Sequence, residues 1–152
     1  RTLQSMRHAR LARYDLVAGV PFGGLHLATA FSLLSGTPLI YLHPAKDGPG
    51  QVIEGTYSSG QTVLIIDDLT TGGRSIVQTA QRLASEHLIV EDALVLLDRQ
   101  QGGHMRLKRE GINLAAILTL EAVLRYLGTS EKITPDWYHK CLEYLGKSHE
   151  NL

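Results

Sequence analysis

The stretch 63-VLIIDDLTTGGRS-75 determines how the rest of the chain is interpreted. Its four branched apolar residues, 63–66, indicate a buried strand, and they run directly into Asp67 and Asp68. A turn that leads from a strand into a helix presents free backbone N–H groups and the positive end of the helix dipole, which suits a phosphate. Carboxylates accept hydrogen bonds from sugar hydroxyls, so the whole stretch predicts a site for a sugar phosphate.

The turn itself contains the residue types that a phosphate site requires. Gly72 and Gly73 allow close approach of the backbone, Thr71 and Ser75 add hydroxyl donors, and Arg74 adds positive charge. A pair of aspartates after a buried strand also occurs in phosphoacceptor receiver domains and as an ordinary solvated strand end. Both are alternatives when the pair is considered alone.

Outward from this stretch, strand-like and helix-like segments alternate. Apolar runs of strand length occupy 14–20, 38–42, 62–69, 92–98 and 113–120. Helical patterns occupy 23–36, the residues around 76–84 and 103–110, and a closing segment from 134 to 146. Strands that are apolar throughout need cover on both faces, which predicts an α/β fold with a doubly wound, mainly parallel sheet flanked by helices. Ligands of such sheets bind beyond the carboxyl ends of the strands.

Two of the predicted helices have a clear apolar face. The first face is formed by Ile76, Val77, Ala80, Leu83 and Ala84. In the closing helix, Thr134 is the expected N-cap, Pro135 the expected first-turn residue and Gly146 the expected end. Its apolar face, which we expect to pack on the core or on a dimer partner, consists of Trp137, Cys141, Leu142 and Leu145.

Residues 43–61 form the longest segment without a clear periodicity, and they are rich in Gly and Pro. Long segments of this kind are more often functional or mobile than structural. We therefore expect this segment to be a lid over the site.

Length and composition limit the possible functions. With 152 residues, of which 43% are hydrophobic, the chain suits a single domain over 1–152. Fifteen basic and fifteen acidic residues give zero net charge without blocks of like charge, which argues against a nucleic-acid partner. The single cysteine, Cys141, cannot form an internal disulfide and is expected to pack, so a cytoplasmic location is the default.

The apolar run that begins at Leu16 imitates a secretion signal, because Arg7, Arg10 and Arg13 precede it. Pro21 and the glycines after it divide the run into a strand and a helix, so we predict no membrane segment. The seven histidines show no metal-ligand spacing, and we predict no metal site built by the protein alone.

Several motifs resemble one enzyme family. The stretch 63–75 is similar to the 5-phosphoribosyl 1-diphosphate (PRPP) signature of type I phosphoribosyltransferases. DALVLLDRQQGG at 92–103 and GINLAAILTL at 111–120 resemble orotate phosphoribosyltransferases, including the corresponding domain of bifunctional UMP synthases. The similarity extends through 15–42 and 53–68. It implies transfer of a phosphoribosyl group from PRPP to orotate, giving orotidine 5-phosphate and diphosphate in pyrimidine (UMP) synthesis.

The resemblance implies roles for individual residues in binding PRPP. Asp67 and Asp68 would hold the ribose hydroxyls and stabilise the charge that develops at the anomeric carbon. Residues 70–75 would cradle the 5-phosphate, and 20–22 would meet the diphosphate. The complete implied set is Val20, Pro21, Phe22, Lys46, Asp67, Asp68, Leu69, Thr70, Thr71, Gly72, Gly73, Arg74 and Ser75.

The resemblance also implies how the base, the leaving group and the metal are held. Arg99 would pair with the orotate carboxylate through two parallel hydrogen bonds, and Thr71 would touch the base as well. Lys46 would act catalytically: it matches a mobile-loop lysine that reaches the neighbouring subunit's site and stabilises departing diphosphate, which implies a homodimer. Mg²⁺ would arrive bound to PRPP, so no cage of protein ligands is needed. The resemblance also allows a fused decarboxylase domain.

The match to the family is imperfect in two places. The family's mobile loop reads Arg-Lys-Glu-x-Lys-x-His-Gly, whereas residues 42–50 here read LHPAKDGPG. In the register that keeps Lys46, the family's other basic residues are replaced by Leu42, His43 and Gly48. The family also has a hood before its first core strand, and we expect that hood to be missing, because only thirteen residues precede the first predicted strand.

Three functions fit these residues. The first is a Mg²⁺-dependent orotate phosphoribosyltransferase. The second is a non-catalytic PRPP-binding regulatory or scaffold domain of the same fold, which the altered lid motivates. The third is a phosphoribosyltransferase for another base, although an arginine at position 99 suits a base that bears a carboxylate. For single residues, a surface ion pair with Asp98 is the alternative for Arg99, and plain solvation is the alternative for Lys46.

Overall fold

The structure is a computed structural model, which describes residues 14–44 and 51–150. Six strands form one sheet in the order β3-β2-β1-β4-β5-β6. The strands are β1 (Leu16–Gly19), β2 (Leu39–Pro44), β3 (Gln51–Glu54), β4 (Thr62–Thr70), β5 (Ile89–Asp98) and β6 (Asn113–Thr119). All neighbouring strands are parallel except β2 and β3. The predicted mainly parallel sheet is confirmed.

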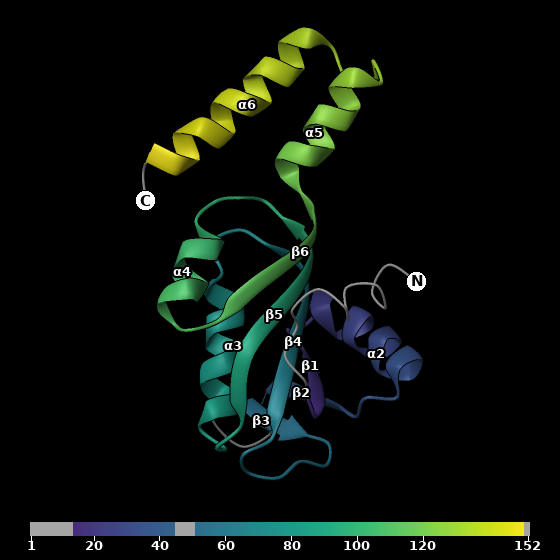
Figure 1. Cartoon of the computed structure of the whole chain (residues 1–152), viewed down its shortest axis with the longest axis vertical. Coiled ribbons are helices and arrows are strands. Elements are labelled where there is room, and N and C mark those ends of the chain that lie inside the picture. The colour runs from purple at the N-terminus through teal and green to yellow at the C-terminus, as the bar shows by residue number, and fades with distance from the viewer. Residues whose placement is uncertain (1–13, 45–50, 151–152) are drawn as a thin grey trace.

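Helices cover both faces of the sheet, as the continuous apolar strands predicted (Figure 1). They are α2 (Gly23–Ser35), α3 (Arg74–Ala84), α4 (Gly103–Arg109), α5 (Leu120–Thr129) and α6 (Pro135–Glu150). One core cluster contains Ile76 and Leu83 of α3 and Leu107 of α4. A second cluster, against α2, contains Ala28 and Phe31. The central strand β4 contributes side chains to both clusters, so the doubly wound arrangement is confirmed.

Four residues of the predicted lid, 51–54, form the strand β3, which the prediction of a long irregular segment missed. β3 pairs with β2 in antiparallel register, with Leu42 opposite Ile53 and Tyr41 opposite Glu54. Leu42 and Ile53 are buried, at 3% and 7% exposure. A strand of only four residues has too little alternation to be recognised by its pattern. Of the rest of the predicted lid, 43–44 end β2, 55–61 contain no helix or strand, and 45–50 lie outside the described residues.

The predicted apolar face of α3 is correct except at its end. Ile76, Ala80 and Leu83 are buried and Val77 is partly buried, whereas Ala84 is exposed. Thr79 is buried in its place. A hydroxyl that follows the helical period can be buried where its neighbours supply apolar contacts, and the sequence pattern alone does not indicate this.

The helix α5 was not predicted, because its sequence continues the apolar run of β6 without a helix-breaking residue. The boundary is set by Thr119, whose side-chain oxygen accepts a hydrogen bond from the backbone N–H of Ala122 at 3.2 Å. Leu120 therefore belongs to α5, whereas the prediction placed it in the strand. Together, α5 and α6 form a helical hairpin that extends beyond the carboxyl ends of the strands (Figure 1).

The start of α6 is confirmed, and its end and its apolar face differ from the prediction. The Thr134 hydroxyl accepts a hydrogen bond from the Trp137 N–H at 3.4 Å, as an N-cap does. The helix continues to Glu150 instead of ending at Gly146. Leu145 is buried, while Trp137 is 63% exposed. The other two residues of the predicted face, Cys141 and Leu142, are only partly buried.

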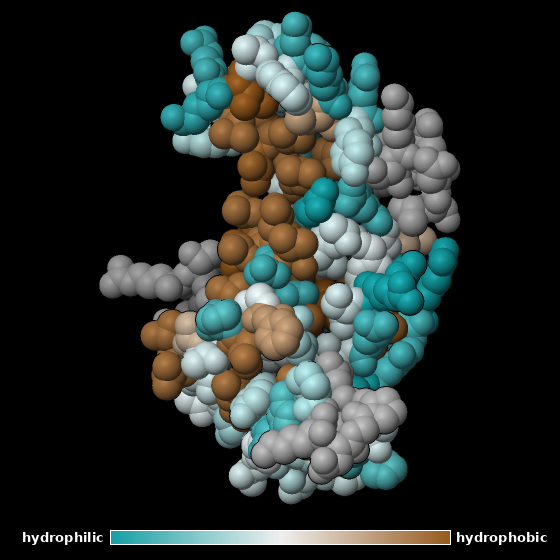
Figure 2. Space-filling view, turned by 180° about the vertical axis from the view of Figure 1, so that it is seen from behind, coloured by the Kyte–Doolittle hydropathy of each residue, from teal (hydrophilic) through white to brown (hydrophobic). Residues whose placement is uncertain are grey.

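One face of the molecule carries a band of apolar side chains that runs from the hairpin at the top to the middle (Figure 2). Exposed apolar residues of the described chain include Leu33 and Leu34 of α2, Leu96 of β5 and Leu118 of β6. A contiguous patch of this kind is typical of a surface that another chain or segment covers. No helix among the described residues is long and apolar enough to cross a membrane.

Candidate functional site

The acid pair and the turn after β1 lie side by side at the carboxyl edge of the sheet. β1 and β4 are parallel neighbours with Gly19 in register with Ile66, and the Val20 N–H donates to the Ile66 carbonyl oxygen at 2.9 Å. Residues 20–22 therefore leave β1 beside Asp67 and Asp68. The peptide bond between Pro21 and Phe22 is cis. The structure thus brings together the two segments that were predicted to bind the ribose and the diphosphate.

Two glycines at the start of α2 permit this close approach. A Cβ atom at Gly23 would collide with the Asp68 carboxylate, and one at Gly24 would collide with the Ile66 carbonyl oxygen. The same Cβ at Gly24 would lie 3.1 Å from the Asp67 Oδ1 atom. A side chain at Gly24 would push α2 away from β4, whereas one at Gly23 would displace the Asp68 carboxylate. The first turn of α2 contains no acidic residue of its own, and the Gly24 N–H bonds to the Asp67 carboxyl.

Asp67 is a buried carboxyl at this edge, with 7% of its surface exposed. Its Oδ1 atom accepts a hydrogen bond from the Asp68 backbone N–H at 2.9 Å. Burial raises the pKa of Asp67 to about 7, and the neighbouring Asp68 side chain adds to the rise, while the backbone N–H groups of Asp68 and Gly24 oppose it. Asp67 is therefore a carboxyl that changes its charge near neutral pH.

Asp68 occupies a different environment from Asp67, although the two are adjacent in sequence. Its side chain is exposed, and its Oδ1 atom accepts a hydrogen bond from the Leu69 N–H at 2.7 Å. The carboxylate also interacts with the Asp67 carboxyl and lies beside Gly23 at the start of α2. Of the two acids, Asp68 is thus the one available to a ligand hydroxyl from solvent.

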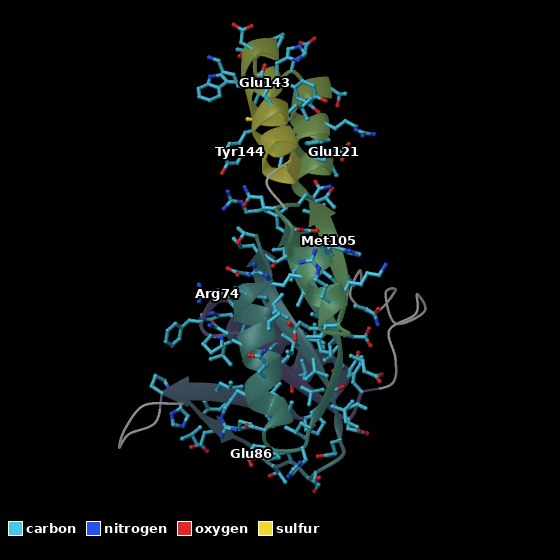
Figure 3. All side chains as sticks on the ribbon, turned by 90° about the vertical axis from the view of Figure 1, so that its left-hand side faces the viewer. Arg74, Glu86, Met105, Glu121, Glu143 and Tyr144 are labelled. Carbon is cyan, nitrogen blue, oxygen red and sulfur yellow. The ribbon has the colours of Figure 1, made fainter. Side chains whose placement is uncertain are left out.

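The turn from β4 into α3 has the geometry expected of a phosphate cradle. Gly73 adopts a left-handed φ of 74° and precedes α3 without a side-chain cap. The first helical hydrogen bond runs from the Val77 N–H to the Gly73 carbonyl oxygen. The N–H groups of 74–76 are consequently left without helical partners, at the positive end of the helix. Arg74 (Figure 3) is exposed beside them. Ser75 is exposed as well, and the first turn contains no acid.

The loop after β5 packs directly on this cradle through its backbone. The Arg99 N–H donates to the Thr70 carbonyl oxygen at 2.9 Å, and the Gly103 N–H donates to the Thr71 carbonyl oxygen at 3.0 Å. A Cβ atom at Gly103 would lie only 2.8 Å from that Thr71 oxygen. The residue predicted to bind orotate is therefore attached to the segment predicted to bind the phosphate.

The structure does not contain the ion pair that was the alternative for Arg99. The Asp98 carboxylate accepts a hydrogen bond from the Gln100 N–H at 2.7 Å. Asp98 is 8% exposed. Across 14–44 and 51–150, no ion pair or side-chain hydrogen bond involves the Arg99 guanidinium. Arg99 is partly buried and its guanidinium can bind an incoming carboxylate.

The lid contains one predicted site residue, Lys46, and the positions at which the family's other basic residues are replaced. Lys46 and Gly48 lie outside the described residues. Leu42 is a core residue of β2. The His43 Nε2 atom lies 3.1 Å from the Glu54 Oε1 atom, and its Nδ1 atom lies 2.7 Å from the Pro44 carbonyl oxygen. Two of the positions at which the family has basic residues thus stabilise the β2–β3 hairpin.

One feature of the site was only partly recognised from the sequence. The glycine doublets 23–24, 72–73 and 102–103 all lie at this one edge, and each contains at least one glycine against which another segment packs. Close approach was expected at 72–73, and the other two doublets could have been used as the same signal. The described residues contain no cluster of three or more His, Cys, Asp or Glu that could hold a metal ion, and the site offers a metal only the acid pair.

Comparison with known proteins identifies the family. No family model matches the chain. The chain is 37% identical over 137 residues to an orotate phosphoribosyltransferase of Caenorhabditis elegans, covering 89% of this chain and 60% of the relative. Similar solved structures include UMP synthase of Leishmania donovani (TM-score 0.82, 32% identity, 96% of this chain and 31% of that one). They also include orotate phosphoribosyltransferase of Aeropyrum pernix (TM-score 0.71, 38% identity, 78% of this chain and 67% of that one).

The chain spans about 60% of the length of the Caenorhabditis elegans relative and a smaller share of the Leishmania donovani protein. The similarity covers the described sheet and the edge at which the acid pair, the cradle and Arg99 meet. The fold, the motifs and the level of identity agree with one another, and the chain belongs to the orotate phosphoribosyltransferase family.

Proposed function

We propose that this chain is the catalytic domain of an orotate phosphoribosyltransferase. In the reaction, the bond between the anomeric carbon of PRPP and its diphosphate breaks, a bond from that carbon to a ring nitrogen of orotate forms, and diphosphate leaves. The observation that carries the proposal is the meeting of the acid pair, the open N-terminus of α3 and an unpaired arginine at one edge of the sheet. Each of these groups matches one part of the two substrates.

The ribose and its phosphate are held by different kinds of group. The N–H groups of 74–76 point to where the 5-phosphate would bind, and Arg74 adds charge. Asp68 accepts hydrogen bonds from ribose hydroxyls and stabilises the positive charge that develops at the anomeric carbon as diphosphate departs. The backbone of 20–22 and the first turn of α2 face the diphosphate. Fixed groups on both sides hold the ribose in position for displacement.

Arg99 selects the base. A guanidinium forms two parallel hydrogen bonds with a carboxylate, and orotate differs from uracil by such a group. A base that lacks the carboxylate would leave Arg99 without this partner. The site therefore favours orotate over uracil or a purine.

Mg²⁺ is expected to enter with PRPP. The described residues offer an acid pair but no cluster of three ligands, which fits a metal held chiefly by substrate oxygens. When bound, the metal neutralises the charge of the departing diphosphate. The chain's own residues then have to place the substrate, not to build a metal site. Removal of Mg²⁺ by a chelator should abolish turnover and leave the fold unchanged by circular dichroism.

Arg99→Ala tests the assignment of the base site in the full-length protein. We expect the KM for orotate to rise by about 10- to 100-fold, since a hydrogen-bonded charged group contributes roughly 1.5–3 kcal/mol. The dissociation constant for PRPP, measured by calorimetry, should change by less than about twofold because Arg99 contacts the cradle only through its backbone. Arg109→Ala, at an exposed position at the end of α4, is the matched control. An unchanged KM for orotate would refute the role.

A second function, PRPP binding without catalysis, is favoured by one observation. Leu42 and His43 are structural residues of the β2–β3 hairpin, at positions where the family has an arginine and a lysine. Calorimetry and a turnover assay separate the two functions. PRPP binding together with formation of orotidine 5-phosphate supports the enzyme, whereas PRPP binding without turnover supports the second function.

The remaining expectations concern assembly and location. The apolar band of Figure 2 supports a homodimer, because a large exposed apolar surface is covered in most stable proteins. A cytoplasmic enzyme, alone or fused to a decarboxylase domain, fits the single cysteine and the UMP synthase relatives. Analytical ultracentrifugation of the full-length protein tests the dimer, and a single monomeric species at micromolar concentration would refute it.

A further inference from the structure

The loop that carries Arg99 contains a residue in an unfavourable backbone conformation. Gln100 has φ 56°, in the left-handed region that residues other than glycine rarely adopt. This conformation is unfavourable for a residue with a side chain. A glycine would adopt it without strain, and two glycines follow at 102 and 103. The contacts of the Gln100 side chain therefore decide whether it stabilises this turn.

The contacts of Gln100 show what holds it in this conformation. Its backbone N–H donates to the Asp98 Oδ1 atom at 2.7 Å. Its side-chain Oε1 atom accepts a hydrogen bond from the Glu121 N–H at 2.9 Å, in the first turn of α5. Gln100 and the N-cap Thr119 thus satisfy two of the N–H groups that the start of a helix leaves without partners. The loop after β5 is attached to the helical hairpin by this bond.

A second bond reinforces the attachment. The Gln101 Nε2 atom donates to the Tyr144 hydroxyl of α6 at 3.2 Å. Figure 3 shows Glu121 and Tyr144 on the part of the hairpin that is nearest to the sheet. On its other side, the loop is bonded to the cradle, through the Arg99 N–H and the Thr70 carbonyl oxygen. Arg99 therefore lies between one bond to the cradle and another to the hairpin.

We propose that Gln100 is a positioning residue for orotate, which sets the direction of the Arg99 guanidinium through its left-handed backbone and its bond to α5. The inference rests on the proposed function, because it takes orotate as the ligand of Arg99. The left-handed residue turns the chain immediately after Arg99, and the Oε1 bond keeps that turn in place. A two-bond contact between guanidinium and carboxylate depends on direction, so a loosened loop weakens binding of the base more than binding of PRPP.

Three substitutions separate the side-chain bond from the backbone conformation. Gln100→Glu keeps an acceptor oxygen at the same reach. Gln100→Asn tolerates the left-handed conformation but is one methylene too short to reach the Glu121 N–H. Gln100→Gly adopts the conformation without strain and removes the side chain. If the bond to α5 positions the Arg99 guanidinium, the Glu variant behaves like the unmodified protein, and the Asn and Gly variants behave like each other.

The test measures the KM and the calorimetric dissociation constant for orotate, and the dissociation constant for PRPP, in the full-length protein. The Gln100→Asn and Gln100→Gly variants should raise the KM and the dissociation constant for orotate by about tenfold. Displacement of a binding group by 1 Å can lower the rate by up to about 100-fold. The Gln100→Glu variant should change the two orotate constants by less than about threefold. In all variants the dissociation constant for PRPP should stay within about twofold of that of the unmodified protein. Unchanged orotate values in the Asn and Gly variants overturn the inference, and so does an equal weakening of PRPP binding.

Hydrogen exchange and the behaviour of the unmodified protein keep the result interpretable. Hydrogen exchange of the segment 119–124 should accelerate in the Asn and Gly variants and not in the Glu variant, whereas a general loss of stability would accelerate exchange throughout the sheet. If the unmodified protein neither binds nor converts orotate, the proposed function and this inference fail together. If it converts orotate and the Asn and Gly variants match it, only the positioning role fails.

Discussion

The carboxyl edge of β1, β4 and β5 differs from the β2–β3 hairpin in how many of its polar groups remain available to a ligand. At the first region, Asp68 is exposed, and the N–H groups of 74–76 and the Arg99 guanidinium have no described partners. At the hairpin, Leu42 is buried and His43 is bonded to Glu54.

Under the proposed function, the first region would bind the ribose, its phosphate and the base, whereas Lys46, in the segment between β2 and β3, would stabilise the departing diphosphate. The binding edge is built by parallel strands whose positions the core determines. The hairpin lies at the margin of the sheet, where only one neighbouring strand constrains it. Residues at the margin can change without disturbing the binding edge, so the two functions can be altered independently.

The largest effect is expected for Asp68→Asn at the binding edge. Loss of the negative charge should lower kcat/KM by about 100- to 1000-fold, as loss of a group that stabilises the transition state does. Steady-state kinetics with PRPP and orotate measure the effect. Glu143→Gln, at an exposed position of α6 (Figure 3), is the charge-matched control and should leave kcat/KM unchanged. A decrease of less than threefold for Asp68→Asn would show that the exposed acid does not act on the ribose.

A smaller effect is expected for Lys46→Ala, beside the hairpin. If this lysine stabilises departing diphosphate, kcat should fall by about 10- to 100-fold, in line with a charge-assisted bond of roughly 1.5–3 kcal/mol. PRPP affinity should change much less, because the binding edge is intact. Lys132→Ala, an exposed lysine between α5 and α6, is the control.

The same variant tests whether the lysine serves the neighbouring subunit. An equimolar mixture of Lys46→Ala and Asp68→Asn subunits, allowed to exchange, should regain about a quarter of the unmodified activity. Half of the dimers are mixed, and one site of each mixed dimer then has both groups. No recovery after confirmed exchange would place Lys46 in its own subunit's site or outside any site.

The pH dependence of stability should distinguish Asp67 from exposed acids. Its pKa is raised to about 7 in the folded protein from 3.8, so the folded state binds this proton more tightly than the unfolded state does. The resulting stability is fully present below pH 3.8 and is lost as the pH rises to about 7. Asp67→Asn, which cannot ionise, should therefore gain stability relative to the unmodified protein between pH 5 and pH 8. We expect about 1–2 kcal/mol, less than full linkage would give, because solvent screens a carboxyl at the sheet edge.

Urea denaturation at pH 5 and pH 8 measures this gain. Asp15→Asn serves as a contrast, because Thr62 hydrogen bonds lower the pKa of Asp15, beginning with the one from its backbone N–H. That variant should lose stability relative to the unmodified protein as the pH rises from 3 to 5. A constant difference between Asp67→Asn and the unmodified protein across pH 5–8 would contradict the raised pKa.

The smallest effect is expected for His43→Ala in the hairpin. The pair with Glu54 is at the surface, so its loss should change the free energy of unfolding by less than about 1 kcal/mol. Turnover should stay within about twofold, because His43 lies in the hairpin and has structural partners. A tenfold decrease in kcat would instead show that His43 acts on the diphosphate. The β2–β3 hairpin would then take part in the reaction as the carboxyl edge does.

Much of the binding edge could be predicted because its signals are local. A continuous apolar run must be buried on both faces, and an acid pair followed by Thr, Gly and Ser has few uses at the end of such a strand. The strand β4, the turn after it and the position of Arg99 at the end of β5 all follow from segments shorter than 15 residues. Lys46 stays a prediction, because it lies outside the described residues.

The missed elements are those whose local signals are weak or ambiguous. The four residues of β3 alternate too briefly to be distinguished from a loop, and only pairing with β2 makes them a strand. Leu120 continues the apolar run of β6, so the change from strand to helix depends on the cap at Thr119. Ala84 follows the helical period of α3, yet no neighbouring element covers it.

The sequence by itself determined the alternation of strands and helices, the acid pair and the phosphate-binding turn, because hydrophobic periodicity and turn chemistry act over a few residues. Only the tertiary structure decided that Asp67 is buried while Asp68 is exposed, and that Gly24 and Gly103 lie against other segments. It also decided that Gln100 joins the arginine loop to α5. These properties depend on atoms that are distant along the chain, and burial, close approach and pKa arise only once packing has brought them together.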